Sequence, residues 1–442
     1  MSQRCATLAA AAALALLAYR FCNLDLAPFI LDEPVFLRAA AAEVASGHWL
    51  SASPIRGSTG VTYGPTVFWF YALVQTLFGS SPAAAILAMC VMVTVAHLAL
   101  AWALADYFGG QRWLLAVMLA WIAASPYQFF WSRLAWDQSV DIAAAWVLVI
   151  LTRRSPFTLT RGLLLGAVLG LGVSSHLMIT PLLVVALVYV AAQRAWRPLA
   201  ACLIFILAIN IPYLRALLSQ PVGTHVAPAI DLSLLGTHLL QPLRVSSLWE
   251  IRYFFDAQWS ELATADRGIG TATAASLFVL TVLTCFGFCA ALRHPTTRRF
   301  ALFALVLWLF TTALHAVCHL EPQPHYMFAS YWVVGVGLAA GLAALQQCPR
   351  AWAVGLAAFA LVAIAQASFI VQWMSFIRAH QGTRGIHYGA TLSAQTQLVR
   401  ERCARGEIIA NTIAPFSVSL EYIAEHEPAC AGKAWRVLKD RQ

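Results

Sequence analysis

The sequence predicts an all-α polytopic membrane protein with about 11 transmembrane helices and a small extracytoplasmic C-terminal α/β domain. Three observations support this. Of the 442 residues, 61% are hydrophobic and 11% are charged, and the mean hydropathy is +0.73. Apolar runs of about 20 residues, the length that crosses a bilayer as a helix, recur along the chain. They stop near residue 374, so we divide the chain into a transmembrane domain, 1–374, and a C-terminal domain, 375–442.

Each predicted span is an apolar run bounded by charged or turn-forming residues. The first run resembles a secretory signal, because Arg4 precedes an Ala/Leu-rich stretch. Since many more spans follow, we interpret it as an uncleaved first helix. The predicted spans are residues 5–24, 82–105, 113–131, 137–152, 162–176, 179–193, 198–215, 271–292, 300–318, 326–347 and 351–374.

The run Pro65–Phe78 is apolar and aromatic, but about 14 residues are few for a span. If it lies at the interface or re-enters, the short arginine-bearing loops share one side, where Asp106 is the only acid. Short cytoplasmic loops are rich in basic residues, which predicts a cytoplasmic N-terminus and an extracytoplasmic C-terminus. The net charge of +9 then comes largely from basic residues that act as topology signals, so we expect no nucleic-acid partner. The arginines are Arg112, Arg153, Arg154, Arg161, Arg194, Arg197, Arg293, Arg298, Arg299 and Arg350.

Four segments fall on the predicted outer side: the loop 25–81, the turn Ser132–Gln138, the loop 216–270 and the tail 375–442. In the two loops we expect a helix over 34–46 and an interfacial helix over Trp249–Trp259. In the tail we expect a helix near Leu392–Cys403, a strand over Ile408–Ile413 and a helix near Ser417–His426.

Of the 10 Cys residues, only Cys403 and Cys430 lie clearly in the outer tail. An oxidising outer compartment favours a disulfide between them. The other cysteines lie mostly in or beside predicted helices, where packing is their usual role. The sequence contains no CxxC or HExxH metal spacing.

Two adjacent acids, Asp32 and Glu33, follow the first predicted span. One interpretation is structural: acids favour a helix N-terminus, and Pro34 suits the first helical position, so either acid could cap a helix. The other is catalytic, because a carboxylate at the membrane surface can deprotonate an incoming hydroxyl or amine. The two roles are compatible.

The second outer turn contains Arg133 and Asp137. Asp137 and Asp141 are four residues apart, so we expect them to share a helix face. Ionisable residues at membrane helices are costly and often functional. The alternative is a local ion pair between Arg133 and Asp137.

Histidines form the other polar group. His176 ends an apolar run, and a late outer loop contains His319, Glu321, His325 and Tyr326. These side chains are either functional or simply solvated. His97 and His315 each stand alone among apolar residues, and we expect both to be hydrogen-bonded packing residues.

An acidic pair in the first outer loop, a short aromatic run after a Pro, and an Arg–Asp turn one hairpin later resemble the membrane glycosyltransferases of the GT-C fold. The nearest group is that of the protein O-mannosyltransferases and lipid A aminoarabinose transferases. The resemblance matches the catalytic carboxylate of that group to Asp32, with Glu33 beside it, and its second-loop Asp to Asp137. It covers most of residues 1–200 and, weakly, 300–330.

Three positions depart from that group. Its Pro-Pro-Leu-aromatic run is matched only loosely by Tyr63–Phe70, its Arg-Tyr pair by His325-Tyr326, and its Lys by His176. These departures affect the expected contacts with the donor phosphate more than they affect the carboxylate matched to Asp32. The candidate substrate-binding residues are therefore Tyr63, Arg133, Asp137, His176, His325 and Tyr326.

The resemblance implies a polyprenyl-phosphate-linked sugar donor, an acceptor that is a lipid, a glycan or a protein, and inversion at the sugar carbon. Asp32 would accept the acceptor's proton. The departing phosphate would be stabilised by cations, with Arg133, His176 and His325 as candidates. The implied location is a bacterial inner membrane, with the site facing the extracytoplasmic side.

Alternatives remain open at this stage. A divalent metal could be held by Asp32, Glu33 and Asp137, although few acids converge by sequence. A secondary transporter would have paired broken helices and polar groups near the membrane centre, whereas these charges lie near the outer boundary. A non-catalytic polysaccharide-assembly protein would need no carboxylate cluster.

Overall fold

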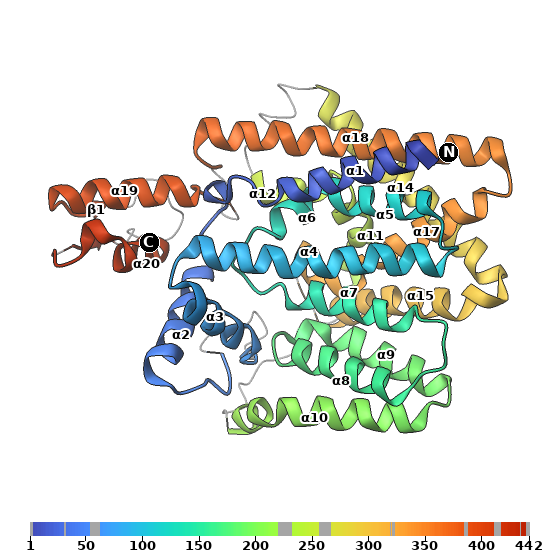
Figure 1. The fold of residues 1–442 in the computed structure, drawn as a ribbon, viewed down its shortest axis with the longest axis horizontal. Helices are drawn as coiled ribbons and strands as arrows, with labels where there is room; N and C mark the ends of the chain where they lie inside the picture. The colour runs from blue at the N-terminus through green and yellow to red at the C-terminus, as the bar shows by residue number, and fades with distance from the viewer. Residues whose placement is uncertain are drawn as a thin grey trace.

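The computed structural model describes residues 3–30, 32–53, 62–219, 232–255, 267–318, 320, 323–383, 388–410, 417–433 and 435–438. Long helices lie side by side along one axis (Figure 1). Each predicted span contains a helix. The helices in question are α1 (Gln3–Tyr19), α4 (Pro82–Tyr107), α5 (Arg112–Ala124), α6 (Pro126–Trp131), α7 (Ser139–Leu151), α8 (Leu159–Val173), α9 (Thr180–Ala192), α10 (Trp196–Ser219), α14 (Arg267–Arg293), α15 (Pro295–Val317), α16 (Phe328–Tyr331), α17 (Val333–Leu345) and α18 (Pro349–His380).

Helix length separates these elements into two groups. In the described segments, five helices are long and apolar enough to cross a membrane, namely α4, α10, α14, α15 and α18. A sixth is added if the 3-10 turn Pro324–Met327 with α16 and α17, bent by 45°, is one span. The other apolar helices have 10–17 residues. The chain is thus a multi-pass helical membrane protein, and the count of about 11 spans stays a prediction.

The two ends of the bundle differ (Figure 1). The N-terminus and the short loops before α5, α8, α10, α15 and α18 lie at one end. At the other end lie the C-terminus, α2 (Glu33–Ser46) and α3 (Thr66–Phe78), which confirms the predicted helix over 34–46. The predicted helix Trp249–Trp259 is represented by a 3-10 turn, Trp249–Ile251, and α12, Arg252–Phe255; residues 256–259 lie outside the described segments. Which side of the membrane each end of the bundle faces stays a prediction.

Glycines allow two pairs of helices to pack at backbone contact. On α8, Gly162, Gly166 and Gly170 face α10, and a Cβ at Gly166 would lie 2.7 Å from the Cys202 carbonyl oxygen. The Asn210 side chain on α10 donates to the Gly170 carbonyl at 3.0 Å. In the second pair, α14 and α17, the close contacts involve Gly287, Gly337 and Gly341. Small residues of this kind let membrane helices approach closely.

Three buried charged or polar side chains form a chain inside the bundle. Arg20 lies 3.2 Å from the His97 ring, and the other nitrogen of that ring lies 3.1 Å from Asp141. The hydrogen-bonded role expected for His97 is confirmed. The shared helix face expected for Asp137 and Asp141 is wrong, because α7 begins at Ser139 and leaves Asp137 outside the helix. His315 is buried beside His238 and has no hydrogen bond to any described residue, so its expected hydrogen bonding is not found.

The tail contains α19 (Leu392–Arg405), α20 (Ser417–His426) and two short parallel strands, β1 (Ile409–Ala410) and β2 (Val437–Leu438). Both predicted helices are confirmed, as is the Cys403–Cys430 disulfide. Residues 411–413 of the predicted strand lie outside the described segments. The domain division and the α/β class of the tail stay predictions. The tail shares a buried apolar cluster with α2, α3 and the start of α4.

Candidate functional site

The acidic pair lies where the chain turns into α2. The helix begins at Glu33, and Asp32 occupies the N-cap position but makes no side-chain capping hydrogen bond, so the cap role is wrong for Asp32. The Glu33 carboxylate instead accepts the Ile30 N–H at 2.8 Å. One acid is therefore tied into the turn, and the other keeps its carboxylate available.

Burial changes the acidity of both side chains. It raises the pKa of Glu33, which is 1% exposed, well above its ordinary value; the Ile30 hydrogen bond opposes this rise, and the Asp32 charge adds to it. Burial also raises the pKa of the half-buried Asp32. A carboxylate with a raised pKa is a stronger base than a solvated one, and Asp32 is therefore suited to accept a proton.

The loop before α3 is anchored against two other helices. A Cβ at Gly64 would overlap the backbone carbonyl of Ser174, and the Thr66 N–H donates to that carbonyl at 3.2 Å. On the other side, the Tyr213 hydroxyl of α10 donates to the Thr62 carbonyl at 2.6 Å. These contacts place the Tyr63 ring 4.5 Å from the His176 ring.

Four of the predicted residues converge around Tyr63. Burial raises the pKa of the Tyr63 phenol, and the charges of Tyr326, Asp137 and Asp32 add to the rise, so all three act on this position. His176 belongs to the same group, because its ring contacts that of Tyr63, and the charge of Asp137 opposes the lowering of its pKa by burial. The His176 Nδ1 accepts the Met178 N–H at 3.1 Å, so the neutral ring carries its hydrogen on Nε2 and can donate it.

His325 lies in an aromatic enclosure. Its ring stacks on Trp131 at 5.1 Å between centroids, and it lies 5.4 Å from Trp136 and 4.4 Å from Tyr326. The two tryptophans were not among the candidate site residues predicted from the sequence, although both lie in the stretch Trp131–Asp137. His319 and Glu321 lie outside the described segments.

Arg133 does not join the site. Its guanidinium is buried and donates to the Asn23 carbonyl and, at 3.1 Å, to the Met374 sulfur, and it lies over the Phe129 ring. The alternative ion pair with Asp137 is not found among the described residues, because the two terminal nitrogens of Arg133 contact Asn23, just after α1, and Met374 on α18. Asp137 instead accepts the Ser139 N–H at 2.9 Å.

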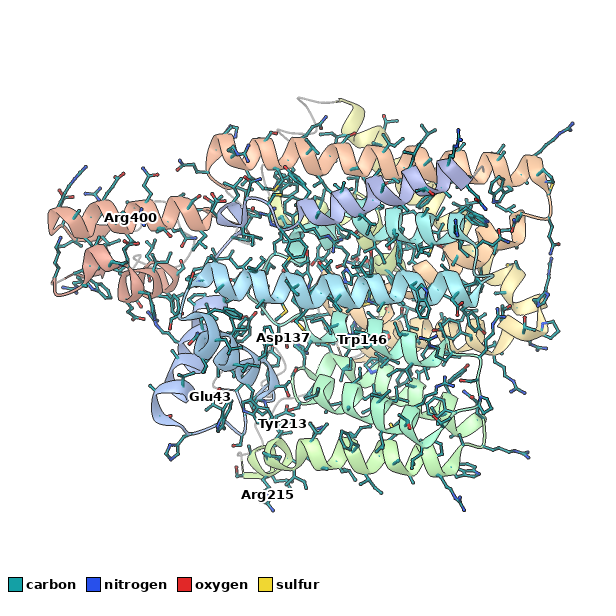
Figure 2. The ribbon with its side chains drawn as sticks, in the orientation of Figure 1. Glu43, Asp137, Trp146, Tyr213, Arg215 and Arg400 are labelled. Atoms are coloured by element: carbon teal, nitrogen blue, oxygen red, sulfur yellow. A yellow bond between two sulfur atoms is a disulfide. The ribbon has the colours of Figure 1, made fainter. Side chains whose placement is uncertain are left out.

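The end of the bundle that carries α2 and α3 opens into an apolar cavity of about 620 Å³ between α3, α4, α7 and α8. Thr66, Asp137 and Ser175 line one end of it, and Arg153 and Arg161 line the other. Asp137 lies at the end near α3, and Trp146 lies farther along α7 (Figure 2). The cavity therefore combines a long apolar wall with a polar end beside the Tyr63 cluster.

The described residues offer no shared metal site. No three His, Cys, Asp or Glu side chains among them are placed to hold one ion. The divalent-metal alternative, with Asp32, Glu33 and Asp137 as ligands, is therefore not supported by the described part of the chain.

Fold and site together define a class of protein: a helical multi-pass membrane protein with an acidic turn after its first helix and an apolar cavity that reaches the same end of the bundle. Two solved structures share the fold, and both are of ArnT from Cupriavidus metallidurans. The apo structure is 18% identical, with a TM-score of 0.51, and the match covers 81% of this chain and 63% of ArnT. The structure bound to undecaprenyl phosphate is 16% identical, with a TM-score of 0.50, and the match covers 96% of this chain and 74% of ArnT.

These comparisons confirm the GT-C fold that the resemblance implied. In the apo comparison this chain spans less than two thirds of the length of ArnT. No family model matches the sequence, and no curated protein matches it by sequence.

Proposed function

We propose that this protein is an integral-membrane glycosyltransferase that moves a sugar from a polyprenyl-phosphate donor to an extracytoplasmic acceptor, with inversion. The observation that carries the proposal is the half-buried Asp32 carboxylate, which has a raised pKa and no capping role, near Tyr63 and Asp137. ArnT, which shares this fold, has been solved bound to undecaprenyl phosphate.

The apolar cavity supports a lipid-linked donor. An isoprenoid chain must remain in an apolar environment while its phosphate and sugar reach water, and the cavity combines apolar walls with a polar end at Asp137. Because the chain is in an apolar environment in the bilayer as well as in the cavity, the cavity would hold and orient it by van der Waals contact rather than by removing it from water. The phosphate would then lie near His176 and Tyr63, within reach of the Nε2–H of His176.

The proposed reaction is a single displacement. Asp32 takes the proton from the acceptor hydroxyl or amine, and the freed electron pair forms the new bond to the anomeric carbon. The bond between that carbon and the phosphate oxygen breaks, and polyprenyl phosphate leaves with its electron pair. With Arg133 turned away, the donors nearest the departing phosphate are His176 and, in its aromatic enclosure, His325.

The proposed location is a bacterial inner membrane, with the site on the extracytoplasmic side. The acceptor is to be tested among lipids, glycans and proteins. One observation favours a second candidate, a transporter: the buried chain of Arg20, His97 and Asp141 inside the bundle, since ionisable groups there often mark ion or substrate paths. Uptake of labelled sugar or lipid-linked sugar into proteoliposomes would distinguish the two.

The test is sugar transfer by purified protein in lipid, with a panel of polyprenyl-phosphate sugars. We expect wild type to release polyprenyl phosphate and Asp32→Asn to do so about 10²- to 10⁴-fold more slowly. The matched control is Asp25→Asn, an exposed acid seven residues earlier in the chain. If both variants transfer sugar at the wild-type rate, Asp32 is not the base.

A further inference from the structure

The segment that leads to the acidic pair is held by the C-terminal tail. The Leu392 N–H donates to the Ala27 carbonyl at 2.9 Å, and Pro28 pairs with Thr391 in an isolated antiparallel bridge. The buried Tyr388 hydroxyl donates to the Leu26 carbonyl. The tail therefore contacts three consecutive residues, 26–28, just before the turn.

One peptide group next to the acids is fixed from both sides. Gln395 on α19 is fully buried, and its side-chain nitrogen donates to the Phe29 carbonyl at 3.0 Å and to the Ala390 carbonyl at 2.9 Å. The N–H of the same peptide group, that of Ile30, donates to Glu33. Because a peptide group is planar, these two hydrogen bonds fix its orientation, and Asp32 follows two residues later.

Contacts of α20 reinforce this arrangement. The Tyr422 ring packs against Phe29 at 5.6 Å, and its hydroxyl donates to the Ser80 carbonyl at 3.0 Å. Arg38 on α2 makes a two-pronged contact with Glu425, at 3.0 and 2.8 Å. That ion pair is partly exposed and contributes little energy by itself. The apolar cluster shared by tail, α2 and α3 contributes the stronger support.

We infer that the tail is a structural part of the candidate site and that Gln395 is a positioning residue for Asp32 and Glu33. An appendage with a separate task would not need to hydrogen-bond, across a separation of 366 residues, to the backbone of the acidic turn. A base misplaced by about 1 Å can lose about 10²-fold in rate. This inference rests on the proposed function for its effect on catalysis, but not for its effect on the geometry of the turn.

The experiment compares Gln395→Met with Gln397→Met in lipid nanodiscs. Gln397 is on the same helix, exposed, and bonded only to Glu401 among the described residues, so it controls for the substitution itself. Amide hydrogen exchange of residues 26–36 reports on the turn, and kcat and KM report on transfer. For Gln395→Met we expect faster exchange and a kcat lowered about 10- to 100-fold, with donor KM changed less than about twofold. Gln397→Met should match wild type.

The outcomes separate the two proposals. Unchanged exchange in Gln395→Met overturns the inference, and so does faster exchange with an unchanged kcat when Asp32→Asn is inactive. If Asp32→Asn retains full activity, the proposed function fails, and exchange alone decides whether the tail holds the turn. Should Gln395→Met not fold, Tyr388→Phe removes only the hydroxyl that donates to Leu26, and the same readouts apply with smaller expected changes.

Discussion

The rings of Tyr63 and His176 lie 4.5 Å apart, although one residue precedes α3 and the other lies between α8 and α9. The contact depends on Gly64, which has no side chain and so lets the loop touch the backbone at Ser174. Asp137 raises the pKa of both side chains, and Asp32 also raises that of Tyr63. The placement of this cluster is therefore set by backbone packing as much as by the polar groups themselves.

Gly64→Ala should disrupt the cluster, because a methyl group at this position would overlap the Ser174 carbonyl and push the loop away. We expect transfer to fall at least tenfold, in keeping with a displacement of about 1 Å. The control is Gly236→Ala, since a methyl group there meets nothing within 4 Å. The measurement is kcat/KM after both variants are shown to be folded. Equal rates for the two variants would mean that the loop tolerates the shift.

The apolar cavity gives a prediction about donor length. Val168→Trp replaces a small aliphatic side chain in the wall of the cavity with an indole ring. The control is Leu163→Trp, which is on the same helix but outside the wall. The indole ring takes the place of chain atoms that would contact the wall, so KM for a long polyprenyl donor should rise. A donor with a short chain should be affected little. Equal effects on both donors would place the lipid elsewhere.

Hydropathy located the helices because each span must satisfy its own backbone hydrogen bonds in lipid, and this requirement is local in sequence. It also located the acidic turn, since Asp32 and Glu33 follow the first apolar run directly. It could not give the direction of Arg133, whose side chain turns to Asn23 and Met374. Local spacing also misplaced Asp137: its carboxylate accepts the Ser139 N–H, and the helix starts after it.

The link between the tail and the acidic turn was beyond sequence reasoning for another reason. Gln395 is one of two glutamines on α19, and nothing in its sequence context distinguishes it from Gln397. Its partner, the Phe29 carbonyl, is a backbone atom 366 residues away. Contacts of this kind leave no pattern in residue type or spacing.

The disulfide between Cys403 and Cys430 should stabilise the tail. Loss of a bridge in a small domain typically costs about 2–5 kcal/mol, so the double variant Cys403→Ser/Cys430→Ser should have a lower Tm. Intact-mass measurement after alkylation without reductant should show both thiols protected. Labelling of Cys403 and Cys430 in the native protein would contradict the prediction.

Glu33 should make stability depend on pH. Its pKa is raised by burial in the folded protein, so its contribution to stability is fully present below the ordinary glutamate pKa of about 4.3 and is lost as pH rises through the folded value. Glu33→Gln removes the ionisation, and Tm should exceed that of wild type at pH 7, with the gap closing toward pH 4. Glu401→Gln, at an exposed position, is the control. If the difference in Tm between Glu33→Gln and wild type widened toward low pH, the pKa of Glu33 would not be raised in the folded protein.

The last prediction concerns the pH dependence of transfer. As base, Asp32 must be ionised in the free enzyme, so kcat/KM should rise with pH along an acid limb. Because burial raises the pKa of Asp32, the midpoint should lie above the ordinary aspartate value of about 3.9. Asp32→Asn should abolish that limb and lower the rate about 10²- to 10⁴-fold, whereas Asp25→Asn should keep both limb and rate. If the limb persists in Asp32→Asn and disappears in Glu33→Gln, the base is the neighbouring acid and the fold assignment is unaffected.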